Sequence, residues 1–160
     1  MADAFTERWK RKEHECGLVA IASKMVTFEE WVLPRDAAPC MSFRQATRQS
    51  RVWEVFGAQA DWSAEDRTRL AAYCVIGSDG AGNPVCVEQR SCAVWLLDHE
   101  DWFGPRQFVN SSIPQLAECL LAYMGETEPE RFRRTVHEID PHALTDGAFW
   151  WHEAAVIGSA

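Results

Sequence analysis

The amino-acid sequence predicts an α+β fold in which a mostly antiparallel sheet of about four to six strands is flanked by helices. Apolar runs at 73–76 and 85–87 flank a loop rich in glycine, asparagine and proline, a pattern typical of a β-hairpin. A third apolar run at 93–97 follows a polar link that is too short for a crossover helix, so it must pair antiparallel. A helical pattern then begins at Ser112.

The third run, 93–97, is apolar at both alternating sets of positions, which predicts a central strand covered on both faces. Phe108 and Val109 predict a fourth short strand. The segment from Ser112 to Gln115 matches a capping box at the start of a helix. Apolar residues then recur at helical spacing as far as Gly125, which suits the left-handed conformation that ends a helix. This helix is expected to pack on the sheet.

The N-terminal part of the chain gives weaker patterns. In order, we expect a helix over 3–12, a helical turn over 28–31, irregular or short-strand structure over 38–43, an edge strand over 52–56, and a turn or helix start over 61–65.

After the central region, residues 127–130 match a second capping box that introduces a helix. A turn is expected at Asp140 and a last helix over 147–157.

Length and composition agree with a single domain over residues 1–160, because 47% hydrophobic residues can build a core without disulfides or a metal. The six cysteines mostly stand where apolar residues are expected, which predicts reduced, buried thiols and no disulfide framework. Charge interrupts the first apolar residues before a secretory signal can form, and no run reaches membrane-spanning length. We therefore expect a cytoplasmic protein that does not contact a membrane.

The formal net charge of -8 argues against direct binding of nucleic acid, which usually requires a basic face. An acidic surface suits a basic protein partner, because opposite charge speeds encounter and gives complementary contacts. The same charge also keeps a small domain soluble, and on charge alone this is the more general explanation.

Enzyme motifs are not found. The glycine-rich loop at 77–84 lacks the ending of a phosphate-binding loop and leads into a strand. Ala81 stands where a calcium loop needs an oxygen ligand. Four His-Glu dipeptides occur, but none has the spacing of a known zinc motif. We therefore expect no catalytic residue, no cofactor and no metal.

One run of polar residues follows the central strand directly. Asp98, His99, Glu100 and Asp101 lie where a site can be displayed. In an extended segment only Asp98 with Glu100, or His99 with Asp101, would converge, which makes a loop in contact with solvent or protein a better interpretation than catalysis. Trp102 follows these charges as either an aromatic anchor for a partner or a lid over the sheet edge.

The order of these segments resembles one protein family. Strand, GSDGAGNP loop, two strands, VWLLDHED, FVNSS and a capped helix are together similar to the SUKH superfamily of bacterial immunity proteins, particularly its fourth subgroup. The likeness covers most of 26–157, and residues 1–25 are interpreted as an N-terminal helical extension. Further similar segments lie at 33–34, 39–43, 139–141, 143–144 and 149–150.

The resemblance implies an immunity protein that binds and neutralises a cognate polymorphic toxin domain, often a nuclease or a nucleic-acid deaminase. We expect it to cover the active site or substrate groove of the toxin with an acidic and aromatic surface. The predicted partner-binding residues are Asp79, Glu88, Asp98, Glu100, Asp101 and Trp102. One alternative is a regulatory scaffold, because the wider superfamily resembles eukaryotic cell-wall regulators. The other is a hydrolase built on the loop from Asp98 to Asp101.

Overall fold

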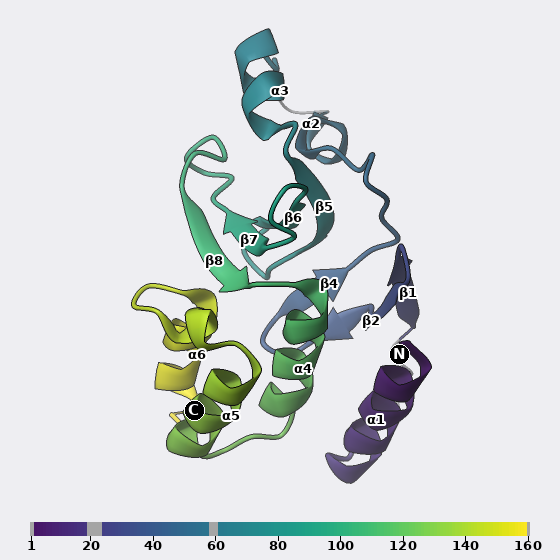
Figure 1. The fold of residues 1–160 in the computed structure, drawn as a ribbon, viewed down its shortest axis with the longest axis vertical. Coiled ribbons are helices and arrows are strands. Elements are labelled where there is room, and N and C mark those ends of the chain that lie inside the picture. The colour runs from purple at the N-terminus through teal and green to yellow at the C-terminus, as the bar shows by residue number, and fades with distance from the viewer. Residues whose placement is uncertain (1, 19–23, 58–60, 160) are drawn as a thin grey trace.

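The structure is a computed structural model that describes residues 2–18, 24–57 and 61–159. Figure 1 shows α2 and α3 at one end of the molecule and α1, α4, α5 and α6 at the other, with the larger sheet between them. The helices are α1 (Ala2–Glu15), α2 (Val52–Val55), α3 (Ala64–Leu70), α4 (Ile113–Tyr123), α5 (Pro129–Ile139) and α6 (Phe149–Val156), with a 3-10 turn over Pro141–Leu144. The strands are β1 (Met25–Phe28), β2 (Trp31–Pro34), β3 (Asp36–Ala37), β4 (Met41–Phe43), β5 (Tyr73–Ser78), β6 (Pro84–Glu88), β7 (Val94–Leu97) and β8 (Arg106–Asn110).

The larger sheet has six strands in the order β3-β4-β5-β6-β7-β8, and every neighbouring pair is antiparallel. The predicted α+β fold is therefore confirmed. The hairpin of β5 and β6 forms as the apolar runs predict, and β7 lies between β6 and β8 with both Val94 and Leu97 buried. The fourth strand predicted at Phe108 and Val109 is β8.

Two predictions for the N-terminal half are wrong. Residues 28–31 form a hairpin turn, in which Phe28 ends β1 and pairs with Trp31 of β2, and Glu29 has a φ of 51°. Val52–Val55 form a helix, α2, in place of an edge strand. Its first turn is fixed by Glu54, whose carboxylate accepts a hydrogen bond of 3.4 Å from the Arg51 amide. In both places a local contact decides the structure of a segment too short for its apolar pattern to do so.

Each face of the larger sheet has its own core. One face packs against α1, α4, α5 and α6, and its largest fully buried side chains are Trp9, Trp150 and Phe132. On the opposite face, Val75, Cys86 and Leu97 meet residues of α2 and α3 and the loop residue Phe103. The predicted helix over 3–12 is confirmed as α1, with Phe5 and Trp9 buried on one side.

The two predicted capping boxes differ in outcome. At α4 the Ser112 hydroxyl accepts from the Gln115 amide at 3.4 Å, as predicted. The Gln115 side chain accepts from the Ser112 hydroxyl at 2.8 Å, in place of the predicted contact with the Ser112 amide, and donates to the Ile139 carbonyl at 3.1 Å. Gly125 has a φ of 72° just beyond α4, as expected. The box predicted at 127–130 is wrong, because α5 begins after Glu128 with no side-chain cap.

All six cysteines are free. The expectation of buried thiols is right for Cys74, Cys86 and Cys119, whereas Cys16 is half-buried and Cys40 and Cys92 are exposed. Of the predicted N-terminal extension over 1–25, α1 lies within the described part, and residues 1 and 19–23 lie outside it. Nowhere in the described residues is there a helix with the length and apolar character to cross a membrane.

Candidate functional site

Two loops meet at one end of the larger sheet. Val85, near the start of β6, pairs with Leu96, near the end of β7. The loop after β5 and the loop after β7 therefore lie at the same end of the strands. Asn83 joins them, because its Oδ1 atom accepts a hydrogen bond of 3.0 Å from the His99 amide and lies 2.7 Å from His99 Nδ1. The structure thus brings the loop of Asp79 next to the loop that begins at Asp98.

Asp79 shapes the first loop from within. Its Oδ1 atom accepts hydrogen bonds from the amides of Ala81 at 2.9 Å and Asn83 at 2.8 Å. Its Oδ2 atom accepts from the Asn83 side chain at 3.1 Å. Gly82 has a φ of 91°, a backbone conformation that glycine adopts more readily than a residue with a Cβ atom. Asp79 therefore stabilises the conformation of its own loop, independently of any contact with a partner.

The second loop is a compact turn, not an extended segment, so the expected convergence of alternate side chains does not apply. Asp98 is half-buried, and its Oδ1 atom accepts from the amides of Glu100 at 2.9 Å and Asp101 at 3.4 Å. The Phe103 amide donates to the Asp98 carbonyl at 2.7 Å. The side chains of Glu100 and Asp101 are left exposed. Of the acidic residues in this run, these two face solvent.

Trp102 is the most exposed aromatic side chain at these loops, with 45% of its surface accessible. Its ring stacks on Trp62 at 5.3 Å between centroids and 23° between planes. Trp102 and the buried Phe103 have consecutive positive φ values of 54° and 57°. Positive φ is uncommon for residues other than glycine, and bulky side chains adopt it least readily.

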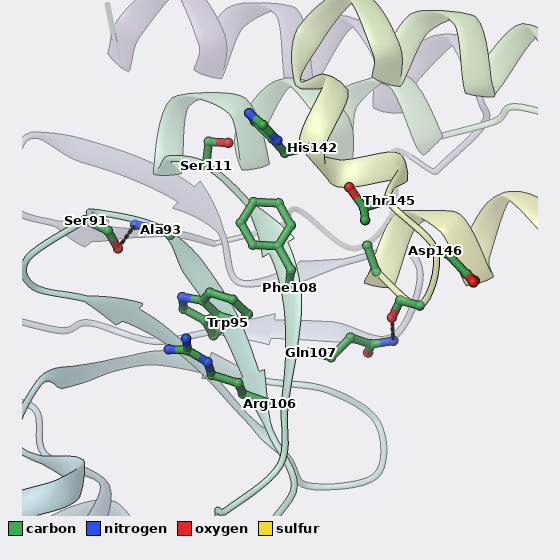
Figure 2. Close-up of a pocket in the computed structure, with 12 residues that line it drawn as sticks. Ser91, Ala93, Trp95, Arg106, Gln107, Phe108, Ser111, His142, Thr145 and Asp146 are labelled. Atoms are coloured by element: carbon green, nitrogen blue, oxygen red, sulfur yellow. Dashed lines mark hydrogen bonds between the residues drawn. The ribbon is translucent and has the colours of Figure 1, made fainter.

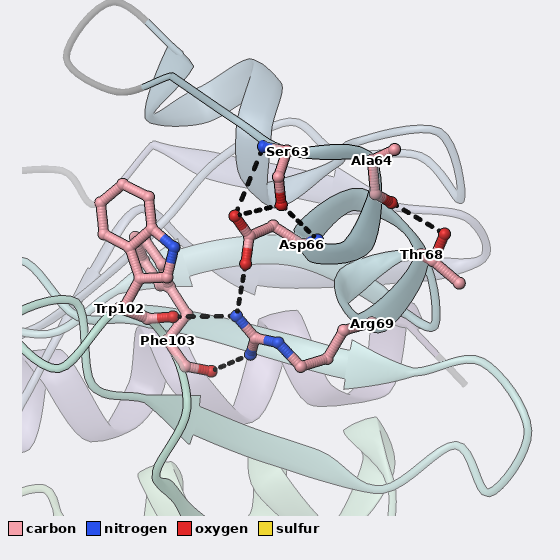
Figure 3. A network of polar contacts seen from close by, with 7 residues as sticks. All are labelled: Ser63, Ala64, Asp66, Thr68, Arg69, Trp102 and Phe103. Atoms are coloured by element: carbon pink, nitrogen blue, oxygen red, sulfur yellow. Dashed lines mark hydrogen bonds and ion pairs between the residues drawn. The ribbon is translucent and has the colours of Figure 1, made fainter.

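Helix α3 holds this backbone in place (Figure 3). Arg69 donates to the carbonyl of Phe103 at 3.0 Å and to the carbonyl of Trp102 at 3.1 Å. Arg69 also lies 3.4 Å from the carboxylate of Asp66. Ser63 caps the helix, since its hydroxyl accepts from the Asp66 amide at 3.0 Å and donates to the Asp66 carboxylate at 2.8 Å. This hydrogen bond from Ser63 is the main cause that lowers the pKa of Asp66.

We call Ser63, Asp66 and Arg69 the α3 clamp. Sequence reasoning predicted a helix start near Asp61 but did not connect it with Trp102. A serine three residues before an aspartate is a signal for a helix cap. No sequence signal pointed to Arg69, because its contacts lie 33 and 34 residues away along the chain.

The structure does not bring Glu88 to these loops. Glu88 lies at the opposite end of β6 and pairs with Tyr73. Its Oε2 atom accepts hydrogen bonds of 3.1 Å from Trp95 Nε1 and from the Ser91 hydroxyl, and lies 3.5 Å from Arg106. Of the six predicted residues, Glu88 is thus the one that lies apart.

A groove of about 630 Å³ lies beside β8 (Figure 2). Phe108 and Trp95 form its apolar floor and meet edge to face at 5.2 Å. The Arg106 guanidinium lies 3.9 Å from the centre of the Trp95 ring. Gln107 donates to the Gly147 carbonyl at 3.0 Å and ties the opposite wall to the strand. None of the predicted partner-binding residues lines this groove.

The described residues contain no group of three or more histidine, cysteine, aspartate or glutamate side chains placed to hold a metal ion. In the loop after β7, Asp98 is engaged with backbone amides and His99 with Asn83.

Comparison with known protein families agrees with the resemblance to the SUKH superfamily that the order of the segments indicates. No curated protein and no solved structure matches the chain. The family model described as "SUKH-4 immunity protein" matches residues 19–157, which is most of the chain. The protein therefore belongs to the SUKH-4 immunity protein family.

Proposed function

We propose that this protein is a stoichiometric inhibitor that binds a cognate toxin domain through the surface formed by Glu100, Asp101 and Trp102, here called the Trp102 surface. Membership of an immunity protein family supports binding to a toxin. The observation that carries the placement is the exposed Trp102, which directly follows the two exposed carboxylates of Glu100 and Asp101. The toxin would be a nuclease or nucleic-acid deaminase whose substrate groove is covered by this surface.

An exposed tryptophan on an ordered loop is suited to anchor a protein interface. Tryptophan is enriched among the residues that carry most of the binding energy, because it buries a large area with few rotatable bonds. Trp102 is already stacked on Trp62, and its backbone is held by Arg69. Little conformational freedom would be lost when a partner covers it.

Charge supports the same placement. The chain has a formal net charge of -8, and Glu100 and Asp101 are exposed beside Trp102. Enzymes that act on nucleic acids present basic grooves to phosphate. An acidic surface is attracted to such a groove and competes there with the nucleic acid, so complementary charge favours both encounter and occlusion.

The first experiment is a pull-down of the tagged protein from its native host, followed by mass spectrometry. We expect the C-terminal toxin domain of a large secreted protein. That domain is then expressed with and without this protein, and cell survival and 1:1 binding are measured. Recovery of signalling proteins with no toxin would contradict the proposal and favour the regulatory scaffold.

Charge reversal tests the placement of the interface. Changing Glu100→Lys and Asp101→Lys together should weaken binding of the toxin domain by about tenfold or more. The matched control is Glu138→Lys with Asp146→Lys, which changes the charge equally at two exposed positions away from the Trp102 surface. Asp146 also lines the groove beside β8. Loss of binding in the control alone would place the interface at the groove or on α5 and refute the placement at the Trp102 surface.

A further inference from the structure

Trp102 and Phe103 adopt a backbone conformation that their own side chains disfavour. Both have positive φ, where the Cβ atom approaches the following carbonyl oxygen. Such a conformation persists only when the surroundings hold it, and residues of this kind concentrate at binding sites. The loop therefore needs support from elsewhere in the fold.

The α3 clamp supplies that support. One guanidinium, that of Arg69, donates to two successive carbonyls, those of Trp102 and Phe103. The planar fork of arginine suits this double contact, which the single ammonium of lysine does not reproduce. Asp66 contacts the same guanidinium nitrogen that donates to the Trp102 carbonyl, and the Ser63 hydroxyl donates to Asp66 (Figure 3).

We propose that Arg69 is a positioning residue for partner binding: the α3 clamp holds Trp102 as a rigid anchor without itself touching the partner. This inference rests on the proposed function and extends it to the partner. The matching toxin surface has an apolar pocket that receives an indole and a basic rim that meets Glu100 and Asp101. Because the anchor is ordered before binding, less conformational entropy is lost on association.

A first test needs no partner. We expect Arg69→Ala to speed amide hydrogen exchange over residues 98–105 by about tenfold, because two hydrogen bonds to a charged group are lost. Arg69→Lys should fall between the wild type and Arg69→Ala. The matched control is Arg133→Ala, which removes an arginine from another exposed ion pair, with Glu130. Unchanged exchange over 98–105 in Arg69→Ala would overturn the clamp whether or not a toxin is found.

A second test asks whether the clamp acts through Trp102. The affinity for the purified toxin domain from the pull-down is measured for Arg69→Ala, Trp102→Ala and the double variant. We expect Arg69→Ala to weaken binding by about tenfold when Trp102 is present and to have little effect when it is absent. If the loss of affinity in the double variant equals the product of the losses in the two single variants, the two residues act independently and the positioning role is overturned.

The two tests separate the inference from the proposed function. If Trp102→Ala binds the toxin domain as tightly as the wild type, the interface lies elsewhere and the role of the clamp in binding is refuted. If Trp102→Ala loses binding but Arg69→Ala keeps full affinity, the proposed interface stands and the inference about Arg69 fails.

Discussion

The indole Nε1 of Trp150 donates a hydrogen bond of 2.8 Å to Oδ1 of Asn110, and both side chains are fully buried. Asn110 in turn donates to the carboxylate of the buried Asp140 at 3.2 Å. Asp140 also accepts from the amide and hydroxyl of Ser111 at 2.7 and 2.8 Å. This polar cluster joins the end of β8 to α6 and to the end of α5.

Replacing Asn110 with leucine should therefore be costly. Asn110→Leu leaves the buried Trp150 N–H without an acceptor and removes a donor from Asp140, so we expect a loss of about 2–4 kcal/mol in the free energy of unfolding. Urea denaturation measures it. The control is Gln107→Leu, which replaces a half-buried amide with one hydrogen bond to Gly147 and should cost about 1 kcal/mol. Equal losses in the two variants would contradict a special role for the cluster.

Trp102 and Phe103 are neighbours with opposite exposure, and their truncation should separate binding from stability. Trp102→Ala should weaken binding of the toxin domain by about 2–4 kcal/mol and change the free energy of unfolding by about 1 kcal/mol or less. Phe103→Ala should destabilise the fold by about 3 kcal/mol, because its ring is buried against Phe56 and Trp62. Calorimetric titration and thermal unfolding measure the two quantities. A large stability loss in Trp102→Ala would favour the alternative of a lid over the sheet edge.

Hydrophobic patterning predicted the larger sheet well where it was unambiguous. Val94 and Leu97 lie in a run too apolar for one exposed face, and the run is a central strand. The start of α4 at Ser112 was predicted correctly, because the serine hydroxyl caps the helix by accepting from the nearby Gln115 amide and needs no distant residue. These elements depend on contacts within a few residues or on the period of the pattern, both of which are present in the sequence.

Other features depend on distant contacts, which the local sequence pattern does not show. Gln115 was expected to complete a capping box, but its amide reaches Ile139 on α5. At the candidate site, the acidic loop and Trp102 are predictions from residue types and from their position after the central strand. The contribution of Arg69 could not be found in this way, because the turn that places Trp102 against α3 follows from the tertiary fold.

Thiol reactivity should follow exposure. Burial raises the pKa of Cys86 strongly and raises the pKa of Cys119 to about 12, so neither forms the reactive thiolate at neutral pH. In the native protein we expect iodoacetamide to modify the exposed Cys40 and Cys92 first. Mass spectrometry of labelled peptides identifies the sites, and labelling in denaturant serves as the control. Early modification of Cys86 or Cys119 would show that the cores on the two faces of the sheet open readily.

Stability at low pH should depend on Glu126. Arg131 donates to its carboxylate at 2.6 and 2.9 Å, the amides of Thr127 and Glu128 add two further hydrogen bonds, and the pKa of Glu126 falls from 4.5 to about 2. Because the pKa in the folded state is the lower one, the stabilisation is complete above pH 4.5 and is lost as the pH falls to about 2.

Glu126→Gln should therefore lower the free energy of unfolding by about 1–2 kcal/mol at neutral pH, a modest figure because the Arg131 side chain is 57% exposed and solvent screens the pair. The difference from the wild type should shrink between pH 4.5 and about 2, since protonation removes the same charge from the wild type. Urea denaturation across this range measures it. The control is Glu138→Gln, an exposed change on α5 that should alter stability by about 0.5 kcal/mol or less. A difference between Glu126→Gln and the wild type that stays constant with pH would mean that the charge of Glu126 does not stabilise the start of α5.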